Sequence, residues 1–181
     1  MATNANATLR VRHDQAKQVA HAVVQCTVEA RLRTPLPILV VEDSDEDYAA
    51  LVRALDGMSA MATLHRCTRA REALEYLRGR GPSADAGRAP RPALILLDLN
   101  LPGMDGRELL TEIRSDEDSR SIPVVIVTTS KHPRDVEWCY EHGANGYHIK
   151  DIDYAKFKDE MRLLVAYWLS VCVLPANAEV R

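Results

Sequence analysis

Chemically active side chains stand directly after four short apolar runs of the sequence. The runs 37–41 and 93–97 end in carboxylates, whereas 123–127 and 146–149 end in a hydroxyl and an ammonium group. Such runs are typical of buried parallel strands, whose carboxyl ends gather the loops and helix N-termini where ligands bind. We therefore expect one rim of a sheet to carry Glu42, Asp43, Asp98, Thr128 and Lys150.

Three carboxylates on one rim need a cation. Two like charges about 4 Å apart repel each other by roughly 4 kcal/mol at an effective dielectric constant near 20, so Glu42, Asp43 and Asp98 would not all stay ionised unaided. Mg²⁺ suits this site, because it binds one or two carboxylates, a carbonyl and several waters and leaves room for phosphate oxygens. With Thr128 and Lys150 on the remaining phosphoryl oxygens, the set predicts that Asp98 accepts a phosphoryl group.

The elements that must position these residues follow from the spacing of the apolar positions. A further, weaker strand is expected at 60–65, and helical spacing recurs at 48–55, 70–77, 106–114, 136–140 and 154–172, with a loop at 79–92. Strands that alternate with helices predict an α/β fold with right-handed crossovers. We expect a doubly wound five-stranded parallel sheet in the order 2-1-3-4-5 with an extended C-terminal helix. The domain would span 35–175, between a partly helical extension at 1–34 and a tail at 176–181.

Composition and charge exclude several classes of function. A net charge of −3 and the lack of a basic run argue against nucleic-acid binding. No apolar stretch approaches the roughly 20 residues of a membrane span. Cysteines 26, 67, 139 and 172 are far apart and show no metal-ligand spacing, which argues against a disulfide framework or a zinc site and favours a cytoplasmic location. The six histidines are also scattered, and we expect all of them on the surface: His13, His21, His65, His132, His142 and His148.

Taken in order, the motifs resemble those of response-regulator receiver domains, the phosphoacceptor half of bacterial two-component signalling, over roughly residues 36–175. The resemblance implies that Asp98 is the phosphorylated aspartate. It also implies that Asp43 and Asp98 ligate Mg²⁺ together with the backbone carbonyl of Asn100, and that Glu42 acts on the metal through a bound water.

The resemblance assigns three further roles. Thr128 would be the hydroxyl that moves onto the phosphoryl group, and Lys150 the lysine that binds it. Tyr147 would be the aromatic switch that rotates inward, although a tyrosine on a strand is commonly a half-buried packing residue. The protein would then catalyse only its own phosphorylation and dephosphorylation, and would not be an enzyme with a separate substrate.

A narrower resemblance concerns the segments 96–102, 127–130 and 166–175, which are similar to stand-alone response regulators that partner bacterial and cyanobacterial phytochromes. It implies a sensor histidine kinase of the phytochrome type as the phosphodonor. The output would be a contact with a downstream protein or phosphotransfer partner.

The sequence departs from the receiver pattern after Lys150, where Asp151 replaces the usual proline. A cis bond before a residue other than proline costs about 2.5–4 kcal/mol, so we expect a trans peptide or a strained one, and competition between Asp151 and the site for Lys150. This departure leaves open a pseudo-receiver that binds partners without phosphorylation. An aspartate-nucleophile phosphohydrolase is a third alternative, but such enzymes need a second acid where Asn100 stands.

The last helix is predicted to be long, with apolar residues at intervals of three and four from Tyr154 to Cys172. One face of it must cover the sheet. Trp168 and the run 171–174 lie beyond what a compact domain needs, and we expect them to form the seam of a homodimer. A modest amphipathic helix at 16–33 is an alternative to a dispensable tail.

Overall fold

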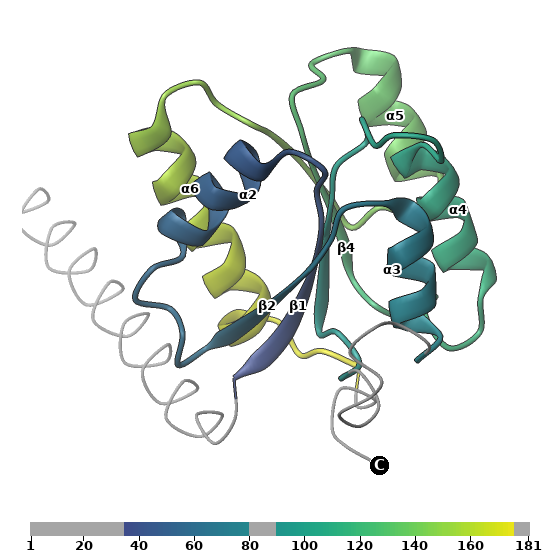
Figure 1. The fold of residues 1–181 in the computed structure, drawn as a ribbon, viewed down its shortest axis with the longest axis horizontal. Helices are drawn as coiled ribbons and strands as arrows, with labels where there is room; N and C mark the ends of the chain where they lie inside the picture. Colours follow the sequence, from purple (N-terminus) through teal and green to yellow (C-terminus); the bar gives the residue numbers. More distant parts are fainter. Residues whose placement is uncertain (1–34, 80–89, 176–181) are drawn as a thin grey trace, which may run out of the picture.

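A computed structural model of the chain describes residues 35–79 and 90–175. Its centre is a five-stranded parallel sheet in the order β2-β1-β3-β4-β5, as predicted (Figure 1). The strands are β1 (Leu36–Val41), β2 (Ala62–Cys67), β3 (Leu94–Leu97), β4 (Val124–Thr128) and β5 (Gly146–Ile149). Only β2 differs appreciably from its expected position, beginning and ending two residues later. The predicted extension 1–34, the tail 176–181 and residues 80–89 of the predicted loop lie outside the described residues.

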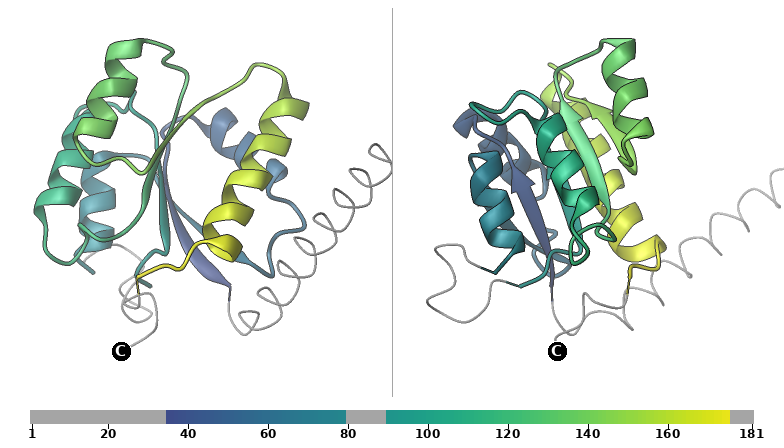
Figure 2. Two further views of the ribbon diagram at one scale, coloured as in Figure 1. Left: turned by 180° about the vertical axis from the view of Figure 1, so that it is seen from behind. Right: turned by 90° about the vertical axis from the view of Figure 1, so that its right-hand side faces the viewer.

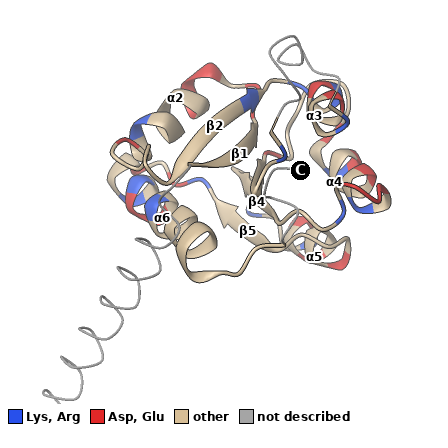
Figure 3. Ribbon diagram, turned by 90° about the horizontal axis from the view of Figure 1, so that it is seen from below, with Lys and Arg blue, Asp and Glu red and all other residues tan. Residues whose placement is uncertain are grey.

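Helices cover both faces of the sheet (Figures 1 and 2). On one face lie α2 (Asp45–Ala54) and α6 (Tyr154–Ala166), which contact each other. On the other lie α3 (Ala70–Leu77), α4 (Gly106–Ser115) and α5 (Pro133–Glu141). None of the described helices is long and apolar enough to cross a membrane. Figure 3 shows acidic and basic residues interspersed over these outer helices, whereas the strands are mainly uncharged.

The two faces bury two separate apolar clusters, which explains why the strands read as continuous apolar runs. In β1, Leu39 and Val41 point into the cluster beneath α3, α4 and α5, and Ile38 and Val40 point into the one beneath α2 and α6. Successive side chains of a strand face opposite sides, so a strand covered on both faces needs apolar residues at every position.

Short polar signals set the helix boundaries next to the sheet rim. Ser44 caps α2 by accepting a hydrogen bond from the Asp47 N–H, and Asp105 and Asp153 cap α4 and α6 in the same way. Asp105 therefore begins a helix. Gly143 follows α5 with a φ of +86°, a conformation that residues with a Cβ resist.

The C-terminal helix continues beyond α6 as one π-helical stretch, η2 (Tyr167–Val171), and ends there. Trp168 and Leu174 were expected to lie beyond what the domain needs, which is wrong, because both are partly buried and pack against the cluster beneath α2 and α6. The homodimer seam itself stays a prediction. The chain turns back after the helix, so that Leu174 lines a small recess beside residues 91–93 and 121–123. Side chains that do face outward are Leu163, Tyr167, Val171 and Val173, which are 72%, 52%, 58% and 89% exposed.

Candidate functional site

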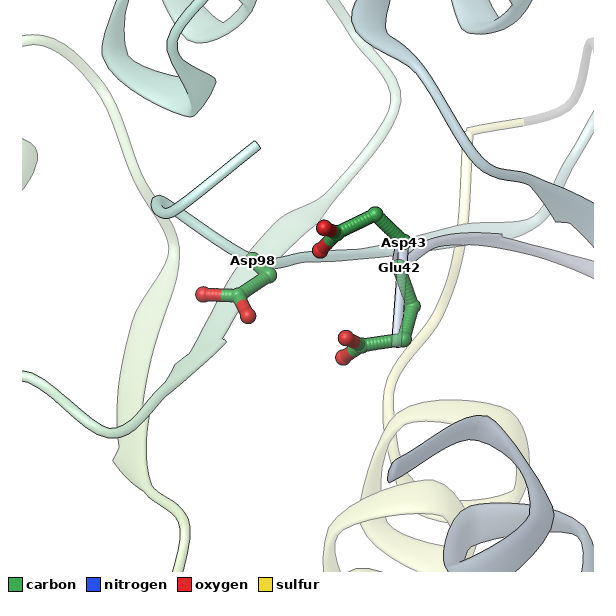
Figure 4. Close-up of side chains that lie close together, drawn as sticks. All are labelled: Glu42, Asp43 and Asp98. Atoms are coloured by element: carbon green, nitrogen blue, oxygen red, sulfur yellow. The ribbon is translucent and has the colours of Figure 1, made fainter. Parts of the chain in front are cut away.

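The three predicted acids meet at the carboxyl edge of the sheet (Figure 4). Glu42 and Asp43 follow β1, and Asp98 follows the neighbouring strand β3. One carboxylate oxygen from each residue lies within 4.8 Å of the others. Glu42 and Asp98 are buried, with 5% and 6% exposure, whereas Asp43 is exposed. Burial raises the pKa of Glu42, although Lys150 opposes this effect.

Arg66 fixes the loop that carries Glu42 and Asp43. Its Nε donates to the Glu42 carbonyl and its Nη2 to the Asp43 carbonyl, each at 3.0 Å, while Nη1 pairs with Asp45 at 2.6 Å. The guanidinium also lies over the Tyr48 ring. Arg66 therefore positions both acids through their backbone. Sequence reasoning missed it, because an arginine in a weak edge strand carries no signal of a contact 24 residues away.

Lys150 is the cation of this cluster. Its Nζ lies 2.6 Å from Glu42 Oε2, 2.7 Å from Asp47 Oδ2 and 2.9 Å from Asp98 Oδ2. Burial would lower the pKa of Lys150, but hydrogen bonds to Asp47 and Glu42 outweigh it and raise that pKa above the ordinary value. The ammonium therefore stays charged. Asp47 was missed as a member of the site, since only the fold brings the first turn of α2 to the end of β5.

Thr128 is fully buried at the end of β4, the strand next to the one that Asp98 follows. Its Oγ1 is 3.5 Å from the Asn100 amide nitrogen and 3.4 Å from the Ser130 N–H. The Asn100 N–H in turn donates to Asp98 Oδ1 at 3.2 Å. Asn100 thus touches both the acid and the hydroxyl, and ligation of a metal by its carbonyl stays a prediction.

Tyr147 is half-buried on β5, and its hydroxyl donates to the Ser130 carbonyl at 3.1 Å. Burial raises its pKa. The side chain packs against the apolar cluster beneath α3, α4 and α5. Its position next to the residues that follow Thr128 agrees with a switch and with a packing residue, so the role in switching stays a prediction.

A second polar network, which the sequence did not indicate, joins this side to two helices. Ser130 Oγ donates to Asp135 at 2.5 Å, and Asp135 pairs with Arg107 at 2.8 Å. Arg107 also pairs with Asp105 at 2.8 Å. The hydrogen bond from Ser130 and the pairing with Arg107 lower the pKa of Asp135. The network therefore ties the segment after β4 to the first turns of α4 and α5.

Gly106 allows α4 to begin directly against Asp98. A Cβ at this position would overlap the Asp98 carbonyl oxygen and lie 2.7 Å from the Leu99 Cα. The Gly106 N–H donates to the Leu99 carbonyl at 3.0 Å. The close approach of two backbones leaves no room for a side chain, so this glycine helps to position the acid.

Asp151 does not compete for Lys150, which corrects our expectation. Its carboxylate pairs with Lys156 at 2.5 Å and accepts the Asp153 N–H at 3.0 Å. No peptide bond in the described ranges is cis, the one between Lys150 and Asp151 included. The replacement of proline therefore leaves Lys150 in contact with the acids.

The prediction for the histidines is wrong at two positions. His148 is only 16% exposed in its side chain, and its Nε2 lies 3.6 Å from Glu160, too far for a hydrogen bond. His65 is partly buried beside the Tyr76 ring. His132 and His142 are exposed, as expected, whereas His13 and His21 lie outside the described residues. Among the described residues, cysteines 67, 139 and 172 form no disulfide, and Cys26 is outside the described ranges.

The donor set fits a hard divalent cation. Carboxylate oxygens are the ligands that Mg²⁺ and similar ions prefer, and one of the three acids is open to solvent, which leaves coordination positions for water. A cation would offset the repulsion that Lys150 relieves only in part. The cluster can therefore bind a divalent metal, although its oxygens do not distinguish Mg²⁺ from Mn²⁺.

Comparison with known proteins agrees with this geometry. A family model described as the response regulator receiver domain matches residues 38–162. Response regulator Rcp1 of Synechocystis sp. is 37% identical over 142 residues, covering 78% of this chain and 95% of that protein.

Two solved structures match as well. The phosphorylated cyanobacterial phytochrome response regulator RcpA superposes with a TM-score of 0.72 at 36% identity, covering 79% of this chain and all of that one. The Mn²⁺-bound form of Rcp1 gives a TM-score of 0.71 at 37% identity over 78% of this chain and 100% of its own. Because the matched residues span most of the sheet, the helices and the acidic cluster, the chain belongs to the response regulator receiver family of two-component signalling.

Proposed function

We propose that Asp98 accepts a phosphoryl group from the phosphohistidine of a sensor histidine kinase. The observation that supports this most directly is the buried ammonium of Lys150, 2.9 Å from Asp98 and flanked by two further acids. A carboxylate between a fixed cation and a metal-binding cluster can receive a phosphoryl group because the added negative charge is neutralised where it arrives.

In the proposed reaction an Asp98 oxygen attacks phosphorus in line with the departing imidazole. The new O–P bond forms as the N–P bond breaks, and the imidazole nitrogen keeps the electron pair of that bond. Lys150 stabilises the charge on the phosphoryl oxygens. Mg²⁺, which Asp43, Asp98 and the Asn100 carbonyl would hold with Glu42 acting through water, would supply further positive charge when bound. Water later hydrolyses the acyl phosphate, so the chain acts only on itself.

The same proposal gives Thr128 and Tyr147 the role of a switch. The buried hydroxyl of Thr128 would turn towards a phosphoryl oxygen on Asp98, leaving its long contacts to Asn100 and Ser130. Tyr147 would then move into the space that opens, giving up its bond to the Ser130 carbonyl. Such a change shifts a two-state equilibrium at the surface formed by α5, β5 and α6.

The partner classes belong to the proposal too. Similarity to the phytochrome response regulator RcpA favours a phytochrome-type kinase, and a protein contact would carry the output. In this proposal the chain is cytoplasmic and forms a homodimer through the C-terminal helix region, where Leu163, Tyr167 and Val171 are exposed. Light scattering of the wild type beside Leu163→Glu tests the dimer, which is excluded if both proteins are monomers.

Intact-mass spectrometry after incubation with Mg²⁺ and acetyl phosphate tests the phosphoryl acceptor. We expect one phosphoryl adduct on the wild type and none on Asp98→Asn. The pseudo-receiver is the alternative outcome, and it would follow if the folded wild type gained no adduct. The pseudo-receiver was left open because Asp151 could draw Lys150 away from the acids. Asp151 pairs with Lys156 instead, so it does not support that alternative. Turnover of a generic phosphate ester would instead point to the phosphohydrolase.

A further inference from the structure

Lys150 has no hydrogen-bond donor to spare. A lysine ammonium carries three N–H donors, and the described partners of Lys150 Nζ are three carboxylates: Glu42, Asp47 and Asp98. A phosphoryl oxygen that contacts Lys150 must therefore displace one of them. The carboxylate that leaves is the one whose separation from Lys150 costs the least free energy.

Exposure separates the three carboxylates. The side chains of Glu42 and Asp98 are each 7% exposed, whereas that of Asp47 is 42% exposed. A buried carboxylate that loses its cation stays unsolvated, and this is costly. Asp47 would be hydrated as it left. Asp47 is thus the partner that Lys150 releases at the lowest cost.

Asp47 is not needed for the start of α2. An acid three residues after a Ser cap commonly reaches back to the N–H of the cap residue. Here the Ser44 N–H donates to Glu42 Oε1 at 3.2 Å, and Ser44 Oγ accepts from the Asp47 backbone N–H. The Asp47 carboxylate instead reaches Lys150, 103 residues further along the chain. Its removal should leave the helix cap intact.

We propose that Asp47 is a positioning residue that restrains Lys150 in the resting protein and slows uptake of the phosphoryl group by Asp98. The inference rests on the proposed function. The carboxylate competes with the incoming phosphoryl oxygens for the same ammonium, and each uptake event must first break the contact between Asp47 and Lys150. The restraint acts on Lys150 alone, so its effect should depend on that residue.

The test measures the rate of adduct formation at saturating Mg²⁺ over a range of acetyl phosphate concentrations. Asp47→Asn keeps the size of the side chain and removes its charge, and Asp47→Ala removes the acceptor altogether. We expect the maximal rate to rise roughly two- to fivefold, the range of a partly exposed ion pair, with Asp47→Asn no faster than Asp47→Ala. Calorimetric titration of Mg²⁺ ensures that each variant is compared at saturation.

Glu46→Gln is the matched control, because it removes the same charge from the neighbouring, exposed position without touching Lys150. A general electrostatic effect on the anionic acetyl phosphate would change its half-saturating concentration equally in Asp47→Asn and in Glu46→Gln. Release of Lys150 raises the maximal rate in Asp47→Asn alone, and that gain should vanish in a Lys150→Gln background.

Two failures can be told apart. If the wild type forms no adduct, the proposed function and this inference are both overturned. If the wild type forms the adduct but Asp47→Asn and Asp47→Ala react no faster, or if the gain survives in Lys150→Gln, only the restraint by Asp47 is overturned.

Discussion

The charged side of the site, at Lys150, and its hydroxyl side, at Thr128, are held in different ways. On one side Lys150 contacts three carboxylates at 2.6–2.9 Å. On the other, the fully buried Thr128 hydroxyl has two long contacts with described residues, at 3.5 and 3.4 Å. Short bonds between opposite charges are roughly twice as strong as neutral ones, and bonds near 3.5 Å contribute little. The charged side is therefore organised before any ligand arrives, whereas the hydroxyl side is free to rearrange.

The same contrast exists along a single strand. Lys150 follows β5 and keeps its charge because acids surround it, with its pKa raised by the hydrogen bonds to Asp47 and Glu42 after burial is overcome. Two residues earlier, burial lowers the pKa of His148, and the nearby Glu160 does not reverse this. The acids around Lys150 therefore favour its charged form, whereas burial of His148 beside α6 favours the neutral imidazole.

Removal of the cation should have the largest effect. Lys150→Met leaves Glu42 and Asp98 buried side by side without their counter-charge, and we expect the free energy of unfolding to fall by about 3–5 kcal/mol in metal-free buffer. Mg²⁺ should restore part of this loss. Urea denaturation with and without Mg²⁺ measures both effects, and Lys156→Met, at an exposed pair, should leave stability unchanged. A similar result for the two variants would end the idea of a preorganised charged side.

Gly106→Ala should disturb both sides through the backbone of Asp98. Because the added Cβ overlaps the Asp98 carbonyl, we expect a loss of about 1–3 kcal/mol together with weaker Mg²⁺ binding. Gly103→Ala is the control, since a Cβ there meets nothing within 4 Å and only the φ of +82° is unfavourable. It should lower stability by about 1 kcal/mol and leave Mg²⁺ affinity unchanged. Calorimetric titration of Mg²⁺ measures both variants, and equal Mg²⁺ affinities would contradict the prediction.

Thr128→Val should have little effect on stability. The hydroxyl has two long contacts and valine has nearly the same shape, so we expect the free energy of unfolding to change by less than about 1 kcal/mol. Thermal or urea denaturation measures this. A loss above about 2 kcal/mol would mean that the hydroxyl is held as firmly as Lys150.

The smallest effect should come from His148 and appear only in acid. Its pKa is lowered in the folded protein, so the unfolded chain binds the proton more readily. Stability should therefore be constant above the ordinary pKa of about 6.5 and decline as the pH falls below it. His148→Gln should flatten this decline in urea midpoints measured between pH 5 and 8. Identical slopes for the two proteins would remove His148 as the cause.

The strands and the rim were predictable because their signals are local. Runs such as 37–41 and 93–97 are apolar at every position, which indicates strands covered on both faces, and each ends in a polar residue. Right-handed crossovers restrict the sheet to a few strand orders, and 2-1-3-4-5 is one of the two common doubly wound ones. These rules bring Glu42, Asp43, Asp98, Thr128 and Lys150 to one edge without knowledge of any side-chain contact.

The contacts that complete the site were not predictable. Arg66 reaches the backbone of Glu42 and Asp43 from β2, and Asp47 reaches Lys150 from α2. Neither position differs in type from an ordinary surface residue. Trp168 was expected to lie beyond what the domain needs, but it is partly buried and packs against the cluster beneath α2 and α6. In each case the outcome depends on the direction of a side chain, which spacing alone does not give.

By itself the sequence determined the fold class, the order of the strands and the group of residues at the rim, because apolar periodicity and chain connectivity restrict the fold to few solutions. Only the tertiary structure decided that Lys150 is shared among three carboxylates, that Asp151 turns to Lys156, and that His148 is partly buried. Those outcomes depend on distances of a few ångströms between residues far apart in the chain, where electrostatic energies change most steeply.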